Sequence, residues 1–135
     1  MSVVVTARAT VEPLTFPTDA RGLVLEPLGP DALPAQKNAH LAVSLPGAVR
    51  GNHYHRLGTE VTVFLGPGLV RVRDADGLRD YEVAPGLAYR FTFPPGVPHA
   101  VLNTGTSPLV ILSFNTQAHD PDHSDLVREV LIETA

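Results

Sequence analysis

Residues 49–60 read VRGNHYHRLGTE, with His53 and His55 one residue apart and Glu60 after a short loop. Side chains of a β-strand alternate between its two faces, so His53 and His55 point to one face and Tyr54 to the other. A turn through residues 56–59 then returns the chain to a second strand that begins at Glu60. The spacing therefore predicts that two imidazoles and one carboxylate approach a single point.

A second stretch, residues 94–103, reads PPGVPHAVLN and supplies a third imidazole. Its prolines and glycine shape a sharp turn before a strand that carries His99. Val101 and Asn103 share the face of His99 on that strand. We expect His99 to join the side chains of the first stretch.

Three neutral imidazoles and a carboxylate suit a borderline divalent metal and leave positions open for water or substrate. We expect His53, His55, Glu60 and His99 to bind zinc in preference to iron, manganese or nickel. A lone His-x-His pair is more often made of surface or packing histidines. The joint occurrence of both stretches favours a metal site.

Short alternating or β-branched segments recur along the chain, between turns rich in the 11 glycines and 13 prolines. This pattern predicts an all-β sandwich or barrel. The predicted strands lie at residues 2–11, 22–28, 40–45, 61–65, 69–73, 80–83, 89–93, 99–103 and 109–114. Residues 124–133, SDLVREVLIE, fit either one short C-terminal helix capped by Ser124 or a terminal strand.

Residues 61–65, VTVFL, are apolar on both faces of the predicted strand. A strand buried on both faces needs cover from a second sheet or another subunit. Together with the apolar N-terminal strand, this predicts a homodimer.

Composition and length restrict the function classes. The 135 residues fit a single domain, 1–135. The chain has ten Lys and Arg against fourteen Asp and Glu and no basic run, so we expect it not to bind nucleic acid. The sequence lacks cysteine, a signal-peptide pattern and a membrane-length apolar run, so we expect a soluble, cytoplasmic protein with no membrane partner.

The two stretches and their flanking glycines resemble the two motifs of the cupin superfamily. The first motif is matched by Gly47, His53, His55, Glu60 and Gly66, and the second by Gly86, Pro94, Gly96, His99 and Asn103. The spacing of Gly66 and Gly86 departs slightly from the pattern. The resemblance implies a double-stranded β-helix, or jelly-roll barrel, with the metal inside its mouth.

A narrower resemblance is to cupins that act on nucleotide-linked deoxy-4-ketosugars, in which an arginine and a glycine precede the first histidine, as Arg50 and Gly51 do here. In the sugar 3,5-epimerases, glutamine stands at the position of His55, and the catalytic histidine is matched by His53. Because all metal positions are filled here, the chain more closely resembles the C-terminal cupin of the capsular-polysaccharide reductases. The tail at residues 112–125, LSFNTQAHDPDHSD, is similar to theirs, although His123 and Ser124 depart from it.

This resemblance implies an isomerase or epimerase that removes a proton beside a metal-polarised carbonyl. The candidate general bases are His40, Tyr54 and Tyr89, although strand tyrosines more often pack than react. Arg50 suits the sugar diphosphate, with a surface arginine as the alternative. Gln36, Asn38 and Asn103 are further candidates for binding the sugar-like substrate, or for structural hydrogen bonds.

Two other functions fit the same residues. An iron- or manganese-dependent dioxygenase would use the same ligand set, and a non-catalytic cupin would bind a small molecule without turnover. The tail residues His119, Asp120, Asp122 and His123 form either a second metal site or, as the proline-broken polar segment favours, a solvated loop.

Overall fold

The computed structural model describes residues 4–134, in which the strands form two five-stranded sheets and a two-stranded ribbon. The first sheet has the order β1 (Thr10–Pro13), β9 (Ala88–Phe93), β6 (Glu60–Leu65), β11 (Leu109–Asn115) and β4 (Asn38–Ser44). The second has the order β12 (Leu126–Arg128), β5 (Val49–His55), β10 (His99–Leu102), β7 (Gly68–Asp74) and β8 (Gly77–Val83). The ribbon pairs β2 (Thr18–Asp19) with β3 (Gly22–Leu23), and a 3-10 turn, η1, spans Leu33–Ala35.

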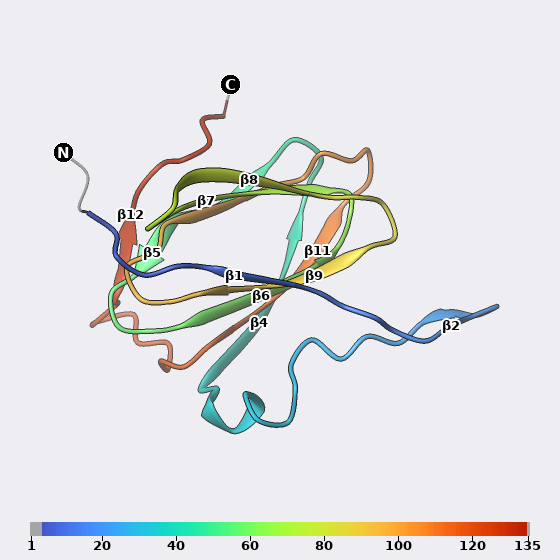
Figure 1. Ribbon diagram of the computed structural model, residues 1–135, viewed down its shortest axis with the longest axis horizontal. Helices are drawn as coiled ribbons and strands as arrows, with labels where there is room; N and C mark the ends of the chain where they lie inside the picture. The colour runs from blue at the N-terminus through green and yellow to red at the C-terminus, as the bar shows by residue number, and fades with distance from the viewer. Residues whose placement is uncertain (1–3, 135) are drawn as a thin grey trace.

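Every pairing within the sheets is antiparallel, and most sheet neighbours are distant in sequence, as in β9, β6 and β11. The two sheets lie against each other as a barrel, and the β2–β3 ribbon projects from it (Figure 1). This arrangement confirms the expected all-β jelly roll.

The core lies between the sheets and follows the two-residue period of the strands. In β7, Val70 and Val72 are fully buried, whereas Leu69 and Arg71 are only partly so. Phe91 stacks between Phe64 and Phe93, with ring centroids 6.1 and 6.2 Å apart. The aromatic side chains therefore fill the barrel beneath its mouth.

Strand β6 is buried on both faces, as the sequence predicts, but its cover comes from the same chain. Phe64 belongs to the inner core, while Val61 and Val63 pack against Leu28, with Leu14 and Leu25 beside them. This burial therefore requires no second subunit, and the sequence argument for a homodimer loses its basis in β6. A homodimer stays a prediction.

The predicted strands at residues 2–11 and 22–28 are mostly wrong. Ser2 and Val3 lie outside the described residues, and the paired strand β1 begins only at Thr10. Before it, the chain is held by the loop after β7, where the Ala9 N–H donates to Asp74 and the Ala75 N–H donates to the Ala7 carbonyl. Of residues 22–28 only the first two pair.

The predicted C-terminal helix is also wrong, and the alternative of a terminal strand is confirmed. β12 pairs antiparallel with β5, with Val127 opposite Tyr54. The following residues are held by Asn52, whose side chain accepts the N–H groups of Leu131 and Ile132. These long-range hydrogen bonds decide against the helical pattern.

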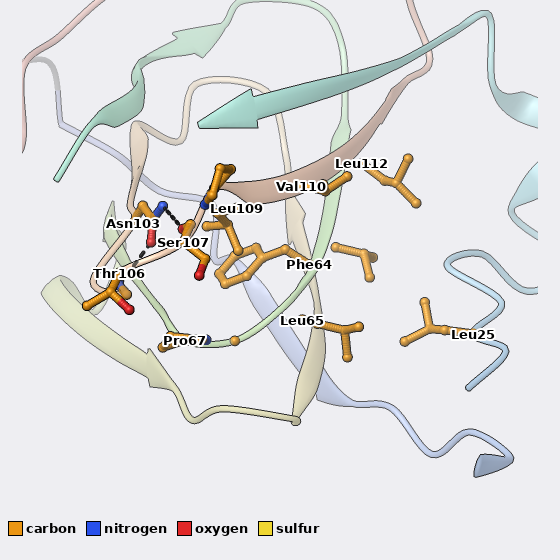
Figure 2. Close-up of a pocket in the computed structure, with 14 residues that line it drawn as sticks. Leu25, Phe64, Leu65, Pro67, Asn103, Thr106, Ser107, Leu109, Val110 and Leu112 are labelled. Atoms are coloured by element: carbon orange, nitrogen blue, oxygen red, sulfur yellow. Dashed lines mark hydrogen bonds between the residues drawn. The ribbon is translucent and has the colours of Figure 1, made fainter. Parts of the chain in front are cut away.

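An apolar groove of about 520 Å³ runs beside the outer face of the first sheet, away from the histidines. Leu65, Val110 and Leu112 line it, with Leu25 at one end and Thr106 and Ser107 at the other (Figure 2). In residues 4–134, no helix has the length and apolarity needed to span a membrane.

Candidate functional site

A cavity of about 660 Å³ occupies the mouth of the barrel, on the side of the histidines. Strands of both sheets and the tail after β11 contribute to its walls. The cavity brings together these residues predicted from sequence: Asn38, His40, Arg50, His53, His55, Glu60 and His99.

Three of the predicted metal ligands converge within this cavity. One ligand atom each of His53, Glu60 and His99 lies within 4.8 Å of the others. The Glu60 carboxylate is central, because its Oε1 lies 3.7 Å from Nε2 of His53 and its Oε2 lies 3.0 Å from Nε2 of His99. His55 contacts the same carboxylate but lies outside this group of three.

His99 has the hydrogen-bonding state of a metal ligand. Its Nδ1 lies 3.0 Å from the Val97 carbonyl, which can only accept a hydrogen bond, so Nδ1 carries the proton. The other nitrogen, Nε2, is buried and makes no hydrogen bond, because its contact with Glu60 is poorly aligned. Nε2 therefore faces the Glu60 carboxylate, and either a proton or a metal cation at this point would balance the negative charge of that carboxylate.

The ring of His99 is further fixed by packing. Phe93 stacks on it with a centroid distance of 3.9 Å and an interplanar angle of 4°. His53 meets the same ring edge to face at 5.0 Å. Phe93 therefore reaches the site directly, while Phe91 and Phe64 lie in the core behind it.

Both ring nitrogens of His55 face carboxylates. Nδ1 lies 2.9 Å from Oδ1 of Asp125, and Nε2 lies 3.1 Å from Oε1 of Glu60. Burial by itself lowers the pKa of His55, but the hydrogen bonds and charges of Glu60 and Asp125 outweigh it and raise that pKa above its usual value. A bound cation would replace the proton at Nε2.

Glu60 stays ionised although it is buried. Burial favours its neutral form, but the charge of His99 and the contacts with His53 and His55 outweigh that effect and hold the pKa of Glu60 well below its usual value. The Thr62 hydroxyl donates to Oε2 at 2.7 Å, and Ser113, 3.2 Å from that hydroxyl, donates to it in turn. This chain of hydroxyls orients the carboxylate.

The backbone before the histidines has a special conformation. Gly51 and Asn52 have positive φ angles of 84° and 56°, opposite a register irregularity between His99 and Ala100 in β10. The Gly96 N–H donates to the His55 carbonyl at 2.8 Å and ties the two histidine-bearing stretches together. The turn chemistry of both stretches thus positions the imidazoles.

Four of the candidate residues do not line the cavity. Tyr54 projects from the opposite face of β5, and Tyr89 packs 6.3 Å from Phe91 in the core. Gln36 donates to the Ala32 carbonyl beside η1. Asn103 holds a turn, since its amide donates to the carbonyls of Ser44 and Ser107 and its oxygen accepts the Gly105 N–H.

The tail forms part of the rim of the cavity as an exposed loop. His123 lies 3.2 Å from Asp120, with their side chains 83% and 51% exposed. Among the described residues, the converging group of metal-ligating side chains is that of His53, Glu60 and His99, and it includes no residue of the tail.

Sequence reasoning missed three side chains that contact the site. Thr62 and Ser113 line the cavity, and Asp125 touches His55. The two-residue period could have found Thr62, which shares a strand face with Glu60. Asp125 is separated from His55 by 70 residues, and only the resemblance of the tail to the capsular group hinted at its position.

Comparison with solved structures shows the same fold in other proteins. The capsular polysaccharide assembling protein CapF from Staphylococcus aureus is 23% identical over 88% of this chain, with a TM-score of 0.65. This chain spans 33% of CapF, about one third of its length. The sugar 3,4-ketoisomerase QdtA from Thermoanaerobacterium thermosaccharolyticum is 18% identical, with a TM-score of 0.68 over 90% of this chain and 88% of QdtA.

A dTDP sugar isomerase from Desulfovibrio desulfuricans is 18% identical, with a TM-score of 0.74 over 89% of this chain and 82% of its own. No curated protein matches the sequence. The sequence profile described as the polysaccharide biosynthesis C-terminal domain matches residues 17–127. Since this match covers most of the 135 residues, the chain belongs to the polysaccharide biosynthesis C-terminal domain family.

Proposed function

We propose that this protein is a metal-dependent isomerase or epimerase that acts on a nucleotide-linked deoxy-4-ketosugar. The observation that carries the proposal is the group of His53 with the buried Glu60 and His99 at the wall of an open cavity, with Nε2 of His99 lacking a hydrogen bond. A cavity of about 660 Å³ is within the usual range for small-molecule sites.

The donor set fits one divalent cation, with zinc ahead of iron, manganese and nickel. His53, Glu60 and His99 would hold it, with His55 as the fourth ligand expected from the sequence. When bound, the cation supplies Lewis acidity to a ketone oxygen and so stabilises an enediolate. Thr62 and the Val97 carbonyl keep Glu60 and His99 in their ligating orientations.

Of the three candidate general bases, only His40 lines the cavity. It lies on β4, and its Nδ1 is 3.1 Å from Oδ1 of Asn38, an oxygen that accepts the hydrogen bond. This contact leaves Nε2 as the proton acceptor. Tyr54 and Tyr89 do not line the cavity and are not proposed for this role.

Arg50 suits the diphosphate of the substrate. Its exposed guanidinium lies at the cavity and donates through Nη2 to the Val43 carbonyl at 2.9 Å, which leaves further N–H groups for phosphate oxygens. The fold shared with QdtA, a sugar 3,4-ketoisomerase described in complex with TDP, supports a nucleotide sugar as the ligand class.

Solvent-hydrogen exchange tests this function. The zinc-loaded protein in D₂O with a 4-keto-6-deoxy nucleotide sugar is expected to lose the proton NMR signals beside the ketone. His40→Asn should slow that exchange by about 10²–10⁴-fold, the typical contribution of a general base, with zinc content unchanged.

His123→Ala, which changes an exposed rim histidine, is the matched control and should exchange at the wild-type rate. Retention of the ring signals by the zinc-loaded wild type, across a panel of such sugars, would contradict the proposal. Oxygen consumption with an iron-loaded protein would then favour the dioxygenase.

A further inference from the structure

The carboxylate of Asp125 is the contact between the C-terminal tail and the histidines of the site. Its side chain is 15% exposed, and its two oxygens have different partners. Oδ1 lies 2.9 Å from Nδ1 of His55. Oδ2 accepts the N–H groups of Leu57 and Gly58 at 3.2 and 2.9 Å.

The first of these contacts sets the state of the His55 ring. An ionised carboxylate only accepts hydrogen bonds, so Nδ1 of His55 carries a proton and donates it. Nε2, the nitrogen that faces Glu60 at 3.1 Å, is thereby presented to the group of His53, Glu60 and His99. Histidines that ligate metals usually donate their other N–H to a carboxylate or a carbonyl, as His99 does to Val97.

The second contact fixes the turn that leads into Glu60. Leu57 and Gly58 stand three and two residues before Glu60, and the Arg56 N–H also donates to the Asp125 carbonyl at 2.9 Å, which further ties the tail to this turn. Gly58 also packs closely against Asn115, because a Cβ added at Gly58 would collide with the Asn115 side chain. The Asp125 carboxylate therefore contacts both His55 and the turn that leads into Glu60.

We infer that Asp125 is a positioning residue for the metal centre, fixing the tautomer and orientation of His55 and the turn before Glu60. The inference rests on the proposed function for its metal. The tail thereby contributes to the metal affinity of the site through Asp125, which is 70 residues from His55 in sequence.

An asparagine at this position cannot keep both contacts. Its single oxygen can accept from His55 or from the N–H groups of the turn, while its amide nitrogen would face the remaining donor. Asp125→Asn is therefore expected to weaken Zn²⁺ binding by about 10–100-fold, the usual effect of losing an outer-shell partner.

Two controls isolate this effect. Asp122→Asn removes the same charge from the exposed tail, and Thr116→Val loosens the same turn by removing the acceptor of the Thr59 N–H, at 3.0 Å, without touching His55. Competition with a chromophoric chelator measures the Zn²⁺ affinity of each protein. Long-range ¹⁵N–¹H NMR of the metal-free proteins, at a pH high enough to keep the His55 ring neutral, reports its tautomer, expected as Nδ1–H in the wild type and as a mixture in Asp125→Asn.

The outcomes separate the inference from the function. Weaker Zn²⁺ binding and an altered tautomer in Asp125→Asn alone support the inference. Wild-type affinity in Asp125→Asn, or an equal loss in Thr116→Val, overturns the inference and leaves the proposed function standing. A wild-type protein that binds no Zn²⁺ overturns both.

Discussion

Asp74 shows at the residue scale how a buried charge can support this fold. Its side chain is 0% exposed at the end of β7, where it accepts the N–H groups of Ala9 and Asp76 and pairs with Arg79 at 2.8 Å. Burial alone would raise the pKa of Asp74, but these hydrogen bonds and the charge of Arg79 outweigh it and lower that pKa below its usual value. The Asp74 carboxylate thus holds the segment before β1, which is not paired as a strand, against the end of β7.

This lowered pKa gives the protein a pH-dependent stability. As the pH falls, the unfolded chain takes up the proton first, near its pKa of about 3.9, so the stabilisation is complete above that value and is lost through the lower folded pKa. Asp74→Asn should lower the free energy of unfolding at pH 7 by about 1–3 kcal/mol. The gap to the wild type should shrink below about pH 4.

Denaturant unfolding at a series of pH values measures this gap. Asp31→Asn, at an exposed position that forms no ion pair within residues 4–134, provides the control and should follow the wild type at every pH. A gap for Asp74→Asn that stays constant from pH 7 into the acid range would contradict the assignment.

At the residue scale, the candidate ligands could be predicted from sequence because their signals are local. The alternation of strand side chains places His53 and His55 on one face, and the prolines and glycine of residues 94–98 predict the turn before His99. Asp125 and Ser113 escaped prediction because their roles depend on contacts between distant strands. The strand pattern predicts that Asn103 shares the strand face of His99, but β10 ends at Leu102 and the Asn103 side chain forms turn hydrogen bonds instead.

At the scale of elements, the pair β5–β10 carries the first and second histidine stretches, and Gly51 allows their close approach. A Cβ at Gly51 would lie 2.8 Å from the carbonyl oxygen of His99, at a φ of +84°. Gly47 has a similar φ of +78° with no atom within 4 Å of its added Cβ. A side chain at either glycine would strain the backbone, but only a side chain at Gly51 would also collide with β10. Comparing substitutions at the two positions therefore isolates the effect of the collision.

Gly51→Ala should destabilise the protein by about 1–3 kcal/mol more than Gly47→Ala, because only the first substitution forces β5 and β10 apart. Displacement of His99 should also weaken Zn²⁺ binding in Gly51→Ala alone. Unfolding by denaturant and chelator competition give both quantities. Equal effects of the two substitutions would show that the close approach does not position His99.

The strands that the sequence predicted well are those of the barrel, where turns bound an alternating apolar pattern. The segment before β1 shares this composition but is held by Asp74 and packs against the core without strand pairing, and the segment after β3 packs on β6. For the C-terminal segment, Asn52 supplies the hydrogen bonds that favour an extended chain over a helix. Composition cannot distinguish such segments, because their conformation is set by distant partners.

At the scale of the whole molecule, the jelly roll brings three parts of the chain to one mouth. β5 and β6 supply His53 and Glu60, β10 supplies His99, and the tail reaches the rim from the far end of the sequence. The sheets beneath are filled by stacked aromatic rings, so the polar cluster lies above a rigid core. This placement favours a preformed geometry for the proposed metal centre over one assembled on binding.

The most direct test of this centre is the number of Zn²⁺ ions bound per chain, measured by native mass spectrometry after equilibration with zinc. We predict one ion in the wild type and in His123→Ala, and an affinity lowered by more than about 100-fold, beyond an outer-shell effect, in His53→Ala and in His99→Ala. A wild type that binds no ion, or a His99→Ala protein that keeps its ion at unchanged affinity, would contradict the account.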